Sequence, residues 1–97
     1  MTELSAADAA VRQARAAEAQ TYAPVERRFA EDKLSRARSA ADAEEYTLAI
    51  ELAAQAQVDG ELAEAKSLAA RARAEVRQKT EENARMSREL LGEGERP

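Results

Sequence analysis

The side chains most able to carry out chemistry are carboxylates, because the chain contains no Cys and no His. Closely spaced acidic residues occur in the segments 44–45, 61–64 and 81–82. Such pairs can act as general acid and base or hold a metal ion. Each pair lies close to Arg or Lys and has no His to complete a ligand set, so a solvated helix surface is the simpler interpretation. We expect no catalytic residue, no metal site, no cofactor and therefore no enzyme.

Basic and aromatic residues suggest no ligand site either. Arginine pairs at 27–28, 36–38 and 71–73 have the residue type that binds phosphates, but acidic residues are interleaved with them. With 15 Lys and Arg against 19 Asp and Glu, the net charge is −4, which argues against a nucleic-acid partner. Three Gly and two Pro exclude a Gly-rich phosphate loop.

The elements that carry these residues are helices. Ala alone accounts for 25 of the 97 residues, and the other common types, Glu, Arg, Leu and Gln, are also strong helix formers. β-Branched residues never alternate with polar ones, so no strand is predicted. No apolar window is long enough to span a bilayer, so we expect no direct membrane insertion. The length allows one domain.

Two breaks divide the helical pattern. The first is at Thr21–Pro24, because proline removes a backbone donor and suits the first turn of a new helix. The second is near Asp42, where Asp42 and Glu45 have the spacing of a capping box. We therefore predict a single domain over residues 1–91, with a disordered tail over 92–97. Its predicted helices are about 4–20, 24–41 and 43–91.

Asp59–Gly60 is a turn signal, but the apolar spacing continues through it. Ala49, Ala53, Ala56, Gly60 and Ala63 are separated by steps of four and three residues, which a turn would disrupt. We predict a continuous third helix. On that basis, Gly60→Ala is expected to stabilise the protein by about 0.5–1 kcal/mol, since Ala is the better interior helix residue.

The helix lengths favour an all-α, antiparallel three-helix arrangement, up-down-up, with a long third helix. The first two helices then cover only the first half of the third. In the alternative, Pro24 merely kinks one long helix. The chain would then form a two-helix hairpin in which residues 4–42 cover the whole of 44–91.

The apolar stripes predict which side chains are buried and which are free. The core is expected to contain Leu4, Val11, Phe29, Leu34, Tyr46, Ala49, Ile50 and Ala53. A second stripe on the third helix, here called the seam, steps by three and four through its uncovered half. Polar Lys79 and Asn83 interrupt it. The candidate seam comprises Leu62, Ala65, Ala69, Ala72, Val76, Met86 and Leu90.

Several short motifs together resemble a bacterial family over roughly residues 6–75. They are Tyr22-Ala23-Pro24, Leu34-x2-Ala37, Glu45-Tyr46-x2-Ala49 and the alanines from position 53 to 69. This pattern is similar to the Ala-rich helical domain of unknown function found in envelope lipoproteins, often ahead of an OmpA-like peptidoglycan-binding domain. The resemblance implies export and a periplasmic or outer-membrane-associated location. The sequence lacks the lipidated Cys and the OmpA-like domain, so we expect either that both lie outside these residues or that the chain is a free-standing soluble member.

Taken together, these features predict a non-enzymatic structural or interaction module of the bacterial cell envelope, acting as a periplasmic spacer or adaptor. Its expected partner is a protein or a second copy, most simply a homodimer through the third helix. The alternative is a cytoplasmic helical adaptor or chaperone-like protein that binds its partner through the same helix.

Overall fold

The computed structural model describes the backbone of residues 1–95 and the side chains of residues 1–92. This part of the chain is all-α, as predicted, and its helices are α1 (Thr2–Ala16), α2 (Ala19–Tyr22), α3 (Pro24–Asp42) and α4 (Tyr46–Glu95). α4 has 50 residues, which at 1.5 Å per residue makes it about 75 Å long. The molecule is accordingly a rod that measures 81 × 19 × 13 Å.

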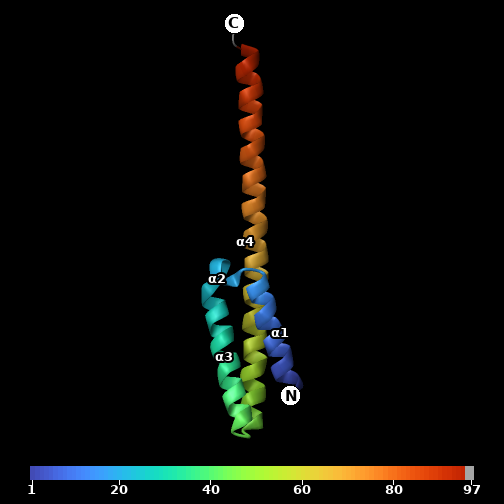
Figure 1. Ribbon diagram of the computed structural model, residues 1–97, viewed down its shortest axis with the longest axis vertical. Coiled ribbons are helices and arrows are strands. Elements are labelled where there is room, and N and C mark those ends of the chain that lie inside the picture. The colour runs from blue at the N-terminus through green and yellow to red at the C-terminus, as the bar shows by residue number, and fades with distance from the viewer. Residues whose placement is uncertain (96–97) are drawn as a thin grey trace.

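The long helix α4 is the centre of the fold. α1 and α3 both pack on its first half, and each contacts α4 more than it contacts the other. Figure 1 shows α1 leading up to α2, α3 returning beside the same part of α4, and the orange-to-red half of α4 projecting beyond them. The two-helix hairpin is therefore wrong, because residues 2–42 double back at Pro24 instead of continuing along α4.

The first helix ends earlier than predicted. α1 stops at Ala16 rather than near residue 20, because Glu18 adopts a positive φ of 67°. The Glu18 N–H donates to the Arg15 carbonyl at 2.9 Å, which closes the helix end. One turn of helix, α2, follows before Pro24 begins α3 as expected.

The second break lies where it was predicted but is built differently. Asp42 is the last residue of α3, not the N-cap of the next helix, so the predicted capping box is wrong. Glu44 has a φ of 61°. Its N–H donates to the Ala41 carbonyl at 3.0 Å, and the Glu45 N–H donates to the Ala40 carbonyl at 2.8 Å. These two bonds form a Schellman motif with Glu where Gly is usual.

We expect Glu44→Gly to raise the free energy of unfolding by about 1 kcal/mol. The left-handed conformation is strained for a residue with a Cβ atom and unstrained for Gly. Urea unfolding followed by circular dichroism measures the change. Glu45→Gly is the matched control, because Glu45 has no positive φ and gains only flexibility. A loss of stability in Glu44→Gly equal to that in the control would contradict this account.

Small residues form the face of α4 that meets the other helices. The buried positions step by four and three residues, as the sequence predicted, and they bury almost no large side chains. Helix axes can approach closely where the residues between them are small. This bundle-facing stripe consists of Ala49, Ala53, Ala56, Gly60, Ala63 and Ser67.

The larger side chains in the core are few. Val11, Leu34 and Leu52 are buried in one cluster with alanines of α1, α3 and α4, and Leu4 packs against that cluster. Of the predicted core, Val11, Leu34, Ala49 and Ala53 are therefore buried, with Leu4 at its edge.

Three predicted core residues are exposed instead. Phe29 is 55% exposed, Tyr46 54% and Ile50 41%. Each is next to, or a few residues from, a buried alanine, but one residue turns a helix by 100°. Phe29 precedes buried Ala30 and Ile50 follows buried Ala49, so each is turned away from the buried face, and Tyr46 is the first residue of α4.

α4 is continuous through Gly60, as predicted. The effect of Gly60→Ala also depends, however, on a contact that the sequence does not show, because Gly60 packs on α1. A Cβ atom there would lie 3.0 Å from both the carbonyl carbon and the Cβ of Ala10. α4 also runs through residues 92–95 of the predicted tail, and residues 96–97 of that tail lie outside the described backbone.

Candidate interaction surface

The bundle ends part of the way along α4. Lys66 Nζ lies 2.5 Å from Glu26 Oε1 on α3, and Arg71 Nε lies 3.7 Å from Glu18 Oε2 near the end of α1. Beyond Arg71, the described side chains form one ion pair, Glu75–Lys79, and one hydrogen bond, Gln78–Glu82. Both lie within α4. We call residues 72–92 the arm, which projects free of α1–α3 (Figure 1).

All seam residues are exposed. Leu62 is 45% exposed, Val76 64% and Leu90 65%, and the alanines between them are exposed as well. Val58 precedes Leu62 by one step of four residues and is 62% exposed. The apolar row therefore begins before the arm, on the side of α4 that faces away from the bundle. Val58 therefore belongs to the same row as the seam residues, although it was not predicted to be one of them.

The seam and the bundle-facing stripe lie on opposite sides of α4. Ala65 and Ala69 are five and nine residues from Gly60, which at 100° per residue places them about 140° and 180° around the helix. Gly60 faces α1, and Asp59 binds Lys33 of α3 at 2.7 Å. The helices of the bundle therefore cover one side of α4 and leave the seam uncovered along its length.

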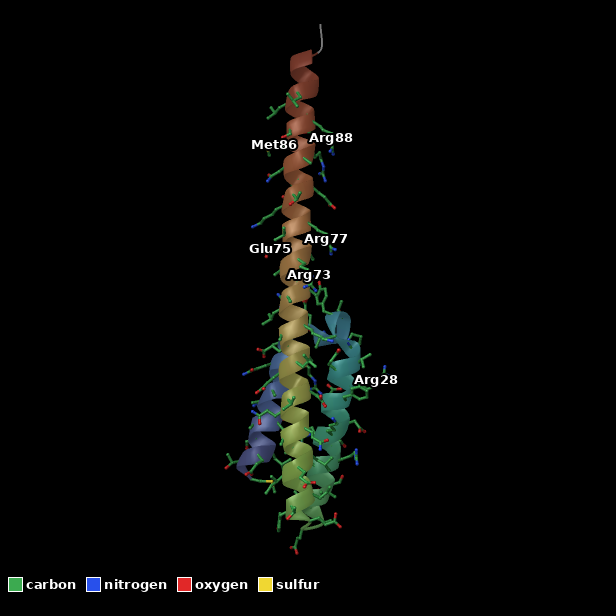
Figure 2. The ribbon with its side chains drawn as sticks, turned by 180° about the vertical axis from the view of Figure 1, so that it is seen from behind. Arg28, Arg73, Glu75, Arg77, Met86 and Arg88 are labelled. Carbon is green, nitrogen blue, oxygen red and sulfur yellow. The ribbon has the colours of Figure 1, made fainter. Side chains whose placement is uncertain are left out.

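Charged residues border the seam asymmetrically, a feature that the sequence analysis missed. The residues just before Leu62, Val76, Asn83 and Leu90 are acidic, and those just after Ala65 and Ala72 are basic. Figure 2 shows that in the arm Glu75 and Met86 point to one side and Arg77 and Arg88 to the other. The acidic edge is Glu61, Glu75, Glu82 and Glu89, and the basic edge is Lys66 and Arg73.

The acidic pairs that suggested chemistry do not converge. Glu44 and Glu45 lie at the α3–α4 turn beside a shallow hollow, whereas the pairs at 61–64 and 81–82 lie far along α4. In residues 1–92, whose side chains are described, no group of three or more acidic residues is arranged to hold a metal ion. No helix within the described backbone is long and apolar enough to cross a membrane.

The upper end of the bundle is joined by a charged hydrogen bond. Lys66 Nζ donates to Glu26 Oε1, and this bond, with help from a backbone N–H, holds the pKa of Glu26 below its ordinary value of 4.5. Because the pKa is lower in the folded chain, the pair adds stability above the unfolded pKa. That stability is lost as the pH falls through the folded pKa.

We expect Lys66→Met to raise the pKa of Glu26 towards its ordinary value, since the main cause of its depression is removed. A carbon-13 NMR titration of the Glu26 carboxyl group measures this directly. Lys79→Met serves as the control, because Lys79 pairs with Glu75 in the arm. A Glu26 pKa that stays low in Lys66→Met would show that another group lowers it.

Comparison with known proteins identifies one family. The family model "Domain of unknown function (DUF4398)" matches residues 2–79, which comprise the bundle and the beginning of the arm. No curated protein matches the chain, and no solved structure does.

Proposed function

Because the chain belongs to the DUF4398 family, we propose that it is a non-enzymatic module of the bacterial cell envelope that acts as a periplasmic spacer or adaptor. In this proposal the bundle is a compact base. The arm extends from it and presents the seam to a protein partner.

The observation that carries this proposal is the unsupported half of α4. A helix gains most of its stability in a protein from packing an apolar face, yet the arm packs against nothing in the described chain. Its seam exposes Val76, Met86 and Leu90 by 59–65%. A row of exposed apolar residues at helical spacing is typical of a surface that another helix covers.

The remaining chemistry supports a structural role. With no Cys or His in the chain, nucleophilic catalysis by a thiol or by an imidazole-activated hydroxyl has no residues to use. The acidic pairs lie apart from one another on different parts of the rod. The location in the envelope rests on the motif resemblance between residues 6 and 75.

Fractionation of the native bacterium tests the location. We expect an antibody against residues 1–92 to detect the gene product in the periplasmic or outer-membrane fraction. Detection in the cytosol alone would contradict the envelope proposal and favour the cytoplasmic adaptor. A cytosolic marker enzyme and a periplasmic marker enzyme, followed in the same fractions, control for lysis.

A further inference from the structure

The seam has the length and spacing of a coiled-coil interface. From Leu62 to Leu90 it steps by three and four residues through four heptads, or about 42 Å of helix. Every seam position is exposed, and the row extends down to Val58. Apart from Lys79 and Asn83 the row is apolar, and an exposed apolar row of this length is typical of a surface that a second helix covers.

The charged edges disfavour one orientation of that second helix. In a parallel pair of identical helices, the residue just before a seam position faces the residue five positions further along on the partner. That partner residue directly follows the next seam position. Glu61 would then face Lys66 of the second copy, which already donates to Glu26 of its own chain. In the arm, Glu75 would face Thr80 and Glu82 would face Ser87, so the parallel pair brings no like charges together along these edges. In an antiparallel pair the acidic edge would face itself, bringing Glu75 against Glu75 and Glu61 against Glu89.

Asn83 adds a second, independent reason for a parallel pair in register. It occupies a seam position between apolar residues. A single Asn at such a position fixes the register and the number of strands of a coiled coil, at a cost in stability. Only when the two copies are parallel and level do their Asn83 amides meet, so that each can donate to and accept from the other.

From these features we propose that the seam binds the seam of a second copy of this chain, forming a parallel, in-register two-stranded coiled coil with the two bundles at the same end. This deepens the proposed function, because it names the partner of the arm. The three seam alanines bury little area, and Lys79 and Asn83 are polar, so the pair is of modest affinity. The bundles do not obstruct it, because they cover the opposite side of α4.

Single-cysteine variants test the orientation, since the chain has no Cys of its own. In the proposed pair, Leu90→Cys forms a disulfide-linked dimer under mild oxidation, because the two copies of position 90 are level and adjacent. Gln78→Cys is the control, because Gln78 lies on the opposite side of the helix from Val76, so this variant should form no disulfide-linked dimer. Cross-linking of Leu90→Cys only when it is mixed with Leu62→Cys would show an antiparallel pair and overturn the proposal.

Sedimentation equilibrium of the intact chain tests the surface itself. We expect a reversible dimer whose Kd rises by about tenfold or more in Val76→Glu, because pairing would bury an unpaired charge. Gln78→Glu adds the same charge outside the seam and should leave the Kd within about twofold. A wild-type chain that is monomeric at every concentration, or a Kd equally unaffected by both substitutions, would overturn the self-pairing. Either result would leave the envelope location, tested separately by fractionation, unaffected.

Discussion

Leu34→Ala is expected to lower the free energy of unfolding by about 2–4 kcal/mol. Leu34 is only 4% exposed and is one of three larger side chains in the main core cluster. Its neighbours there are mostly alanines, which cannot rearrange to fill the space that the leucine leaves. Thermal and urea unfolding, followed by circular dichroism at 222 nm, measure the loss.

Leu68→Ala provides the matched control for Leu34→Ala. It removes the same atoms from α4 at a position that is 49% exposed, so we expect a loss of less than about 1 kcal/mol. If Leu34→Ala does not fold, Leu34→Val should still fold with a smaller loss. Equal effects of the substitutions at positions 34 and 68 would show that the core lies elsewhere.

Gly60→Ala is expected to destabilise the protein by about 1–2 kcal/mol. The methyl group would meet backbone and Cβ atoms of Ala10 at 3.0 Å, so α1 must move away from α4. Overpacking of this kind costs about 1–3 kcal/mol, while the better helix propensity of Ala returns up to about 1 kcal/mol. The change in urea midpoint at constant slope gives the net effect.

Gly92→Ala separates the effect of overpacking against α1 from the effect of the better helix propensity of Ala. Gly92 also lies within α4, but a Cβ atom there meets nothing within 4 Å. The substitution should therefore leave the unfolding of the bundle unchanged and increase the helical signal slightly. A stabilised Gly60→Ala protein would contradict this prediction and would mean that α1 can shift enough to admit the methyl group.

Helix spacing predicted much of the fold because one sequence pattern dominated it. The steps of three and four residues through Ala49, Ala53 and Ala56 identified the buried face of α4 and its continuity through Gly60. Proline at position 24 identified the start of α3. These signals depend only on residues that are close together in the sequence, so they can be recognised without the structure.

Other features depend on how closely the helices approach. The sequence gives no direct signal that α1 lies against Gly60, so helix propensity alone led to the opposite expectation for a methyl group there. Phe29 precedes buried Ala30 and is turned away from the core. The left-handed residues Glu18 and Glu44 carry no glycine signal, so the end of α1 and the form of the second turn were not foreseen.

The seam residues are exposed, as their spacing indicates, but that spacing does not show how the charges along the two edges are arranged. Exposure of Leu62, Val76 and Leu90 follows from their phase relative to the buried stripe. Acidic Glu75 and basic Arg73 lie on either side of that row. Their charges bear on how a partner pairs with α4 because the bundle occupies the opposite side of the helix. Which side a partner can approach is a property of the folded chain.

Amide hydrogen exchange, measured residue by residue at low micromolar and at near-millimolar protein, tests the central claim most directly. That claim is that α4 is held by its own chain in its first half and by a second copy in the arm. We predict that amides from Ala49 to Ser67 are strongly protected at both concentrations. Amides from Val76 to Leu90 should exchange rapidly in the dilute protein and slowly in the concentrated protein. Arm amides with the same protection at both concentrations would contradict the account.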